Sequence, residues 1–341
     1  MLDTRARVRA SENAALINQL IAKAQPSLGD VHINRPLVDV SVAYMQRDTE
    51  MIATRMFPQV SVQKKSDLFY VYSRADWYRS EARRRAPGTE SAGSGWNLTT
   101  QSYLCERWAI HKDVSDDIRA NSDQALNPDM EATEYVTQQC MLAREIVWTD
   151  SYFQAGIWAT DTTPGTLWDA ANSTPIEDIR AQIYNVKGAT GYKPNVLALS
   201  PRVWLVLQDH PDFTSRINSG QTPGGPAIVN LQTLAQVLEL DEVMVAWGVR
   251  NTAIEGAAEA TDFIVGNHAL LAYRAPSPGL MTPSAGYTFA WTGLLGAGAF
   301  GNRIKTFRLE REEVDRVECD LAFQCNVVAP ELGVLFEDPI S

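Results

Sequence analysis

The sequence predicts an α+β fold, in which an extended β-hairpin, one long helix and a compact α/β segment follow one another along the chain. Aromatic and β-branched residues form two strand-like runs, Asp67–Arg74 and Tyr103–His111, on either side of a long polar loop. Apolar residues recur at helical spacing over Asp129–Ala155, which no glycine or proline interrupts. From about residue 170 onward, short helical and strand-like segments alternate.

The loop of the predicted hairpin carries an unusual set of side chains. Aromatic residues and arginines are crowded within it: Trp77, Tyr78, Arg79, Arg83, Arg84, Arg85 and Trp96. Unstructured loops longer than about 15 residues are uncommon in compact domains and are usually functional or disordered. An arginine run is compatible with a solvated face, whereas exposed aromatics beside arginine are typical of interfaces. Both interpretations stay open from the residues alone.

The predicted long helix has a clear start. Asn127 is a suitable N-cap and Pro128 suits the first helical turn. Acidic residues follow and favour the positive end of the helix dipole. One apolar stripe then runs along the helix: Ala132, Val136, Cys140, Ala143 and Val147, widened by Tyr135, Leu142, Ile146 and Phe153. At 1.5 Å per residue this helix is about 40 Å long.

The α/β segment is predicted from a helix starting at Thr174-Pro175, a buried strand Asn195–Leu199 and a helix Arg202–Gln208 that follows a Ser200-Pro201 cap. Further short helices and strands continue to residue 273. After Asn302 the chain returns to strands that mix charged and apolar residues, and these are expected to rejoin the region of the long helix. The first 60 residues are expected to form an arm, extended around Pro36.

Composition limits the classes of function. The chain has 341 residues, enough for two domains, and a net charge of −11, which argues against a dedicated nucleic-acid binder. Such an acidic surface is compatible with facing packaged nucleic acid without adhering to it. The four cysteines show no C-x-x-C spacing and are expected to be reduced and largely buried. No apolar run is long enough to span a membrane, and we expect no secretory signal.

Three patterns that bear on chemistry have simpler explanations. Ser200, Asp209 and His210 suggest a catalytic set, but Ser200 stands in a helix-capping position and no G-x-S-x-G elbow is present. Gly296–Gly301 matches G-x-G-x-x-G, but the residues after Gly301 are strand-like, so the helix that dinucleotide binding needs is missing. Asp116 and Asp117 are expected to start a helical turn rather than bind metal. We therefore predict no catalytic residues, no cofactor and no metal site.

The order of arm, long hairpin, spine helix, α/β domain and return strands resembles the HK97-type major capsid proteins of tailed bacteriophages. Four segments resemble that family locally: Val31–Leu37 continuing to Ala43-Tyr44, Pro194–Val203, Leu234–Leu238 with Asp241–Val243, and Val249–Ala253. The resemblance implies an N-terminal arm over 1–60 and an E-loop hairpin over 61–110. It implies a P-domain over 111–170 and 301–341, with its spine helix at about 128–156, and an A-domain over 171–300.

The resemblance implies a structural protein, not an enzyme, that self-assembles into the icosahedral shell around a phage genome. Expected partners are other copies of the chain in hexamers and pentamers, a separate scaffolding protein, a portal, a candidate decoration protein and double-stranded DNA on the inner face, without a membrane. The expected location is the virion capsid, assembled and matured from a procapsid in the host cytoplasm. Trp77, Arg79, Arg83, Arg84, Arg85 and Trp96 become candidate inter-subunit contacts.

The resemblance leaves several questions open. Some members of the family form Lys–Asn cross-links, but Lys64 and Lys65 lie at the base of the hairpin and no partner asparagine is identified. An encapsulin-like nanocompartment shell shares the fold and is the alternative function. A nucleotide-dependent enzyme and a monomeric binding protein are competitors from other classes, which a nicotinamide dinucleotide (NAD) titration and electron microscopy respectively would distinguish.

Overall fold

The structure is a computed structural model that describes residues 45–122, 127–219, 229–279, 281–295 and 302–341. The described chain divides into two compact units. One holds Ile110–Thr137 and Ile304–Glu318, and the other holds Gln46–Ala109, Gln138–Arg303 and Cys319–Ser341. Most of the expected N-terminal arm lies outside the described residues.

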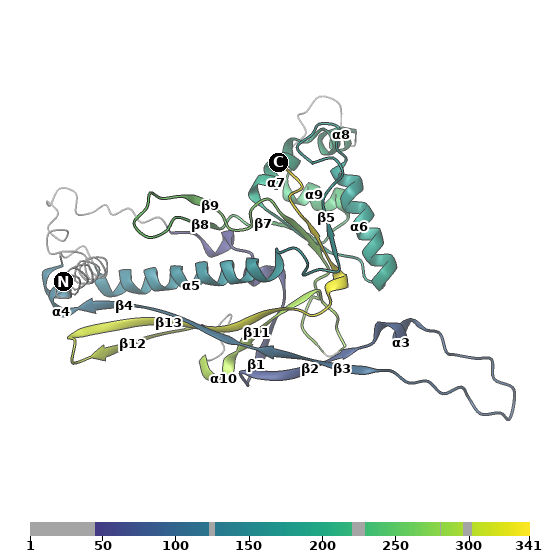
Figure 1. The fold of residues 1–341 in the computed structure, drawn as a ribbon, viewed down its shortest axis with the longest axis horizontal. Coiled ribbons are helices and arrows are strands. Elements are labelled where there is room, and N and C mark those ends of the chain that lie inside the picture. The colour runs from purple at the N-terminus through teal and green to yellow at the C-terminus, as the bar shows by residue number, and fades with distance from the viewer. Residues whose placement is uncertain (1–44, 123–126, 220–228, 280, 296–301) are drawn as a thin grey trace, which may run out of the picture. The chain divides into compact units, whose positions relative to one another are not determined.

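The first unit is built from the hairpin of two C-terminal strands, a third strand and two helices (Figure 1). Its elements are parts of β4 (Glu106–Ser115), α4 (Asp116–Asn121), α5 (Pro128–Tyr152), β12 (Arg303–Leu309) and β13 (Val314–Val327). In the sheet, β13 pairs with β12 and with β4. One buried apolar cluster among the described residues of this unit is small and contains Val114, Ala132 and Val317.

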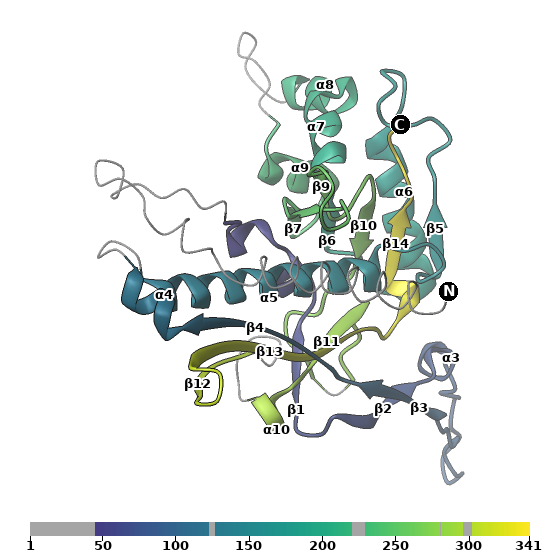
Figure 2. The same ribbon diagram turned by 60° about the vertical axis from the view of Figure 1, so that its left-hand side comes forward.

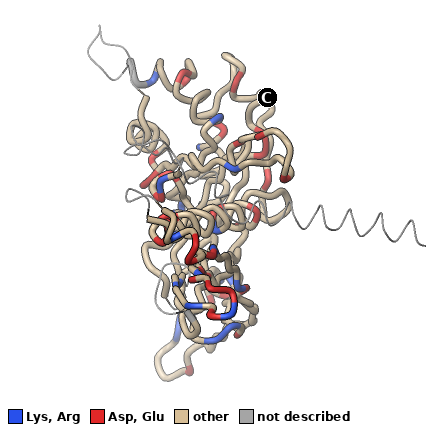
Figure 3. Tube along the Cα trace, turned by 90° about the vertical axis from the view of Figure 1, so that its left-hand side faces the viewer, with Lys and Arg blue, Asp and Glu red and all other residues tan. Residues whose placement is uncertain are grey.

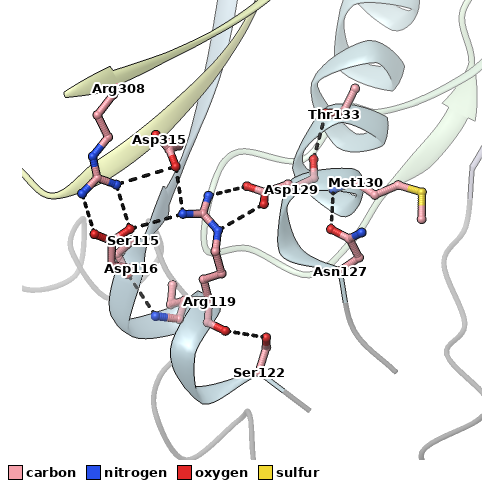
Figure 4. A network of polar contacts seen from close by, with 11 residues as sticks. Ser115, Asp116, Arg119, Ser122, Asn127, Asp129, Met130, Thr133, Arg308 and Asp315 are labelled. Carbon is pink, nitrogen blue, oxygen red and sulfur yellow. Dashed lines mark hydrogen bonds and ion pairs between the residues drawn. The ribbon is translucent and has the colours of Figure 1, made fainter. Parts of the chain in front are cut away.

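A network of ion pairs supplements that small core (Figure 4). Arg119 of α4 donates to Asp129 of α5 at 2.6 and 3.1 Å and pairs with Asp315 of β13 at 2.8 Å. Arg308 of β12 donates to both carboxylate oxygens of Asp116 at 2.7 and 2.5 Å. The Arg308 bonds hold the pKa of Asp116 below its usual value. Two guanidinium groups thus join two helices and two strands.

The predicted helix starts are confirmed in this unit. The Asn127 side chain accepts a hydrogen bond from the backbone N–H of Met130 at 3.2 Å, as an N-cap does. Ser115 caps α4 by accepting from Ile118 at 3.3 Å, so Asp116 occupies a first helical turn.

Helix α5 is shorter than the sequence predicts. It ends at Tyr152, four residues before the expected end, and Gly156 lies beyond it in a left-handed conformation with φ of 81°. The apolar stripe is buried at Ala132, Val136 and Cys140, but Tyr135 is exposed rather than part of it.

The second unit contains the α/β segment (Figure 2). Its sheet has the order β5 (Thr160–Thr162), β14 (Gly333–Phe336), β10 (Ala269–Ala272), β6 (Val196–Leu199) and β7 (Glu242–Val245). The accompanying helices are α6 (Pro175–Thr190), α7 (Pro201–Asp209), α8 (Pro211–Ser219) and α9 (Leu231–Leu238). Apolar residues of these helices and strands, among them Trp168, Ile179, Leu207, Leu271 and Phe336, form the largest core cluster.

The C-terminal strand of that sheet, β14, is not where the sequence predicts it. The sequence predicts that the C-terminal strands rejoin the region of the long helix, but β14 pairs antiparallel with β10 and parallel with β5. Gly333–Phe336 is buried at every position, which is typical of a central strand with both faces covered. A four-residue apolar run does not indicate which sheet it joins.

The remaining described elements of the second unit complete its framework. A second sheet joins β1 (Gln59–Val62) in parallel with β11 (Gly286–Trp291), which pairs antiparallel with β13. The hairpin of β8 (Val249–Asn251) and β9 (Thr261–Phe263) is separate. The short elements are η2 (Asp48–Glu50), α2 (Ala53–Met56), α10 (Thr292–Leu295) and η4 (Pro330–Leu332). The predicted hairpin is formed by β2 (Ser66–Tyr72), α3 (Arg74–Tyr78) and β3 (Leu98–Leu104).

A buried carboxylate fixes the segment before β1. Glu145 of α5 is fully buried. Its carboxylate accepts hydrogen bonds from the backbone N–H groups of Ile52 at 2.9 Å and Ala53 at 3.0 Å, at the start of α2. Burial raises the pKa of Glu145, while the two donors act in the opposite direction. Beside it, Arg144 pairs with Asp48 at 2.7 Å. Residues 48–53 are therefore held on α5 by side-chain contacts.

We predict that Glu145→Ala lowers the free energy of unfolding by about 2–4 kcal/mol, because it leaves two buried N–H groups unpaired. Glu145→Gln keeps one acceptor and should cost less. Urea denaturation measures both, with Glu134→Ala, an exposed site on the same helix, as the control expected to stay within about 0.5 kcal/mol. A loss no larger than that of the control would contradict this role.

A second prediction concerns acid. Arg316 donates to Asp113 at 2.7 and 2.8 Å and holds the pKa of that carboxyl below its usual value. A lowered pKa means that the stabilisation is complete above about pH 4 and fades as the pH falls through the folded-state value. Asp113→Asn should therefore cost about 1–2 kcal/mol at pH 7 and much less near pH 2.5. A difference from wild type that does not change with pH in chemical denaturation would refute this.

Candidate inter-subunit interface

The predicted hairpin is a two-stranded ribbon of β2 (Ser66–Tyr72) and β3 (Leu98–Leu104) (Figure 1). Its register runs from Ser66 opposite Leu104 to Tyr72 opposite Leu98. The sequence predicts Tyr103–His111 as the returning strand. That range is in strands, as predicted, but it covers only the end of β3 and then enters β4, and the strand that pairs with β2 is Leu98–Leu104. The first part of β3 is mostly polar, so it lacks the apolar pattern by which strands are recognised, although its threonines favour strands.

One face of the ribbon packs on its own unit. The rings of Phe69 and Tyr103 lie 5.5 and 4.8 Å from the ring of Phe289 on β11, and the Tyr103 ring is stacked. Nearby, the backbone N–H of Leu104 donates to the Gln324 side chain at 2.6 Å. The base of the ribbon is therefore anchored.

The opposite face of the ribbon is apolar and exposed. Residues opposite each other in an antiparallel pair share a face, so Leu68, Tyr70, Leu98 and Leu104 lie together. Leu68 is 60% exposed and Tyr70 is 66% exposed. We call these four residues the outer face. The predicted site did not include them, although alternation along β2 was a signal that could have identified them.

Beyond β2 the chain forms α3 (Arg74–Tyr78) and an aromatic cluster. The ring of Trp77 lies 6.3 Å from Tyr72 and 6.4 Å from Trp96, and both tryptophans are more than half exposed. Asp76 accepts hydrogen bonds from the backbone and side-chain nitrogens of Asn97 at 2.8 and 3.0 Å. The structure thus brings together Trp77 and Trp96, which are 19 positions apart in the sequence.

The arginines lie in the exposed loop that follows α3. Arg79 pairs with Glu81 at 3.8 Å, and the Arg85 side chain donates to the carbonyl of Thr89. Among the residues that the structure describes, Arg83 and Arg84 form no ion pair. We call Arg83, Arg84 and Arg85 the arginine tip. All six sequence-predicted contact residues are exposed, and their contact with another subunit stays a prediction.

The suspected catalytic set does not form. Ser200 caps α7 by accepting from the backbone N–H of Val203 at 3.2 Å, as predicted. His210 is buried and instead lies 2.9 Å from Ser173, while its Nδ1 accepts from the N–H of Asp212. A neutral imidazole that accepts at Nδ1 carries its proton on Nε2, so it cannot deprotonate the Ser173 hydroxyl. His210 therefore has a structural role.

Two other patterns in the sequence bear on chemistry, a glycine-rich run and acidic or cysteine clusters. Gly296–Gly301 lies outside the described residues, and the chain after it forms strand β12 rather than a helix. Across the described ranges, no group of histidine, cysteine, aspartate and glutamate side chains is placed to hold a metal ion. The four cysteines are free, and Cys325 is only partly buried whereas the other three are buried. Burial raises the pKa of Cys105 to about 11, which keeps it an unreactive thiol.

The chain is similar to known proteins in three-dimensional structure but not detectably in sequence. No protein-family model and no curated protein matches this sequence. A crystal structure of a phage-related protein from Bordetella bronchiseptica is similar with a TM-score of 0.61 and 18% identity, over 86% of this chain and 93% of that one. The capsid of the cyanophage P-SCSP1u gives 0.57 and 11%, over 92% and 95%. The encapsulin SrpI complex of Synechococcus elongatus gives 0.53 and 11%, over 89% and 93%.

These likenesses establish the fold. The chain has the HK97-like fold of phage capsid proteins, an α+β architecture with an extended hairpin and a long helix. In the part of the chain that the structure describes, no helix is both long and apolar enough to cross a membrane.

Proposed function

We propose that this chain is a major capsid protein that self-assembles into the icosahedral shell around the genome of a tailed bacteriophage. The observation that carries the proposal is the ribbon, whose inner face packs on its own unit while its outer face and arginine tip remain exposed. Structures with the same fold include a cyanophage capsid and the mature capsid of phage PhiM1.

The finer features belong to the same proposal. The role is structural rather than catalytic, the shell is built of hexamers and pentamers, and it forms in the host cytoplasm with a scaffolding protein, a portal and a candidate decoration protein. The N-terminal arm, E-loop, P-domain and A-domain take the limits given above, except that β14 is assigned to the A-domain with the sheet that it joins. Double-stranded DNA faces the acidic inner surface of the virion.

Electrostatics supports a role for the arginine tip. Copies of a chain with net charge −11 repel one another, and Figure 3 shows acidic positions spread widely along the tube. A compact positive segment steers such chains towards each other's acidic surfaces. The turn between β12 and β13 offers such a surface, because Glu310, Glu312 and Glu313 are exposed and none of them lies within ion-pair distance of a described cation. Glu310 and Glu312 interact with Arg308 and Arg316 only through longer-range electrostatics. We call these three the acidic turn and propose that the arginine tip of one copy pairs with the acidic turn of another.

An encapsulin-like shell is the second candidate, because the encapsulin complex of Synechococcus elongatus shares the fold. The contents of purified particles distinguish the two functions. Double-stranded DNA inside particles from infected cells supports the capsid, whereas a co-purified cargo protein in DNA-free particles supports the nanocompartment.

The direct test is electron microscopy of the purified chain, alone and with co-expressed scaffolding protein, and of phage lysate. We expect closed shells of uniform diameter. If the chain stays monomeric under all three conditions, the proposal is wrong.

The pairing of arginine tip and acidic turn predicts a charge-reversal effect. Replacing the arginine tip by three glutamates should lower the salt concentration and temperature at which shells fall apart, because each exposed pair contributes about 0.2–1 kcal/mol and recurs in every copy. Reversing the acidic turn to arginine in the same chain should restore both. Reversing three other exposed glutamates instead, Glu106, Glu131 and Glu134, is the charge-matched control and should restore neither. Normal shells from the three-glutamate variant, or equal rescue by the control, would exclude this pairing.

A further inference from the structure

Tyr78 joins the hairpin to the end of α6. Its hydroxyl, on the last residue of α3, donates to the carbonyl of Thr190, the last residue of α6. The next residue, Gly191, caps α6 in the left-handed region with φ of 74°. A Cβ on Gly191 would lie 2.7 Å from the Tyr78 oxygen and 3.2 Å from Cζ. Position 191 therefore favours glycine for two reasons: the backbone has a positive φ, and the absence of a Cβ leaves room for the tyrosine. We call this space beside Gly191 the notch.

The two partners in this contact differ in how firmly they are held. Helix α6 is fixed by buried side chains along one face, including Ile176, Ile179 and Ile183. Its last turn is closed by Lys187, whose Nζ donates to the carbonyl of Gly191 at 2.6 Å. Helix α3 has no buried residue. The notch is thus a firm receptor, and α3 depends on it for its position.

Contacts within the loop make α3 and the returning chain a single body. Asp76 binds Asn97, and the Ser73 N–H donates to the Asn97 carbonyl at 3.2 Å. One further link to the rest of the unit is Arg74, which pairs with Glu331 at a long 3.7 Å between exposed groups. Such a pair contributes little. Tyr78 is accordingly the main attachment of this body beyond the strands themselves.

We propose that Tyr78 in the Gly191 notch is a latch that sets the direction in which the loop presents its tryptophans and arginine tip. With the latch closed, the loop leaves the ribbon at one angle. With it open, residues 73–97 move on the ends of β2 and β3. One neutral hydrogen bond and one ring contact make the latch reversible. Its role in assembly rests on the proposed function, but the latch itself is a property of the single chain.

The test is hydrogen exchange of the dispersed subunit, followed over residues 73–97. Gly191→Ala fills the notch, and Tyr78→Phe removes only the hydroxyl. Both should accelerate exchange of the α3 and Asn97 amides several-fold while the first three turns of α6 keep their protection. Because both variants act through one contact, the double variant should exchange no faster than Gly191→Ala alone.

Two controls separate the latch from other effects. Gly156→Ala carries the same positive-φ penalty with nothing within 4 Å of its Cβ, and Tyr184→Phe changes an exposed tyrosine of α6. Neither should alter exchange at 73–97. Unchanged exchange in both latch variants, or additive effects in the double variant, would overturn the latch even if shells form. Absence of shells from the wild type would refute the proposed function and leave the exchange result standing.

Discussion

A two-stranded ribbon can bury only one of its faces on the chain that makes it, and the rest of this structure depends on that constraint. An isolated ribbon is marginal in water. Here the rings of Tyr103, which is stacked, and Phe69, which is tilted, contact Phe289 and anchor the base of the ribbon. The outer face then keeps four large apolar side chains in water. An arrangement of this kind is stable in a monomer but reaches its full burial only with a second surface.

The charges of the chain are used in two different ways. In the first unit, Arg119, Arg308 and Arg316 each bind carboxylates that their own fold supplies, and these pairs act beside the small buried cluster of Val114, Ala132 and Val317. In the loop, Arg83 and Arg84 have no such partner among the described residues. Guanidinium groups are well suited to bidentate pairing with carboxylates, so a run of them without internal partners favours recognition between chains. The difference lies in whether the backbone brings an acid within reach.

Local signals in the sequence were sufficient for local structure. The caps at Asn127 and Ser200 depend on side chains that bond to the backbone three residues later, and both are found as predicted. The sequence was not sufficient to predict features that depend on residues far away along the chain, namely strand register and sheet membership. The register that makes Leu98 and Leu104 part of the outer face is set by β2, and the sheet that β14 joins is set by β10. The predicted aromatic and arginine residues are exposed, but no local pattern indicates that Tyr78 contacts Gly191, more than 100 positions away.

The Tyr78 contact meets a requirement of assembly that the ribbon alone does not meet. An interface repeated in a closed shell needs each copy to offer its surface in the same direction. A loop that spans residues 73–97 and is attached to two strands does not provide this by itself. A helix end is a suitable reference, because its last carbonyls lack partners within the helix and accept bonds from outside. Thr190 offers such a carbonyl, and Gly191 gives Tyr78 room to approach it. The attachment is a single neutral hydrogen bond rather than a buried ion pair, so it stabilises the loop only modestly. Contacts of the kind proposed with a neighbouring copy would be able to replace it, which would let the same loop be ordered before association and adjusted during it.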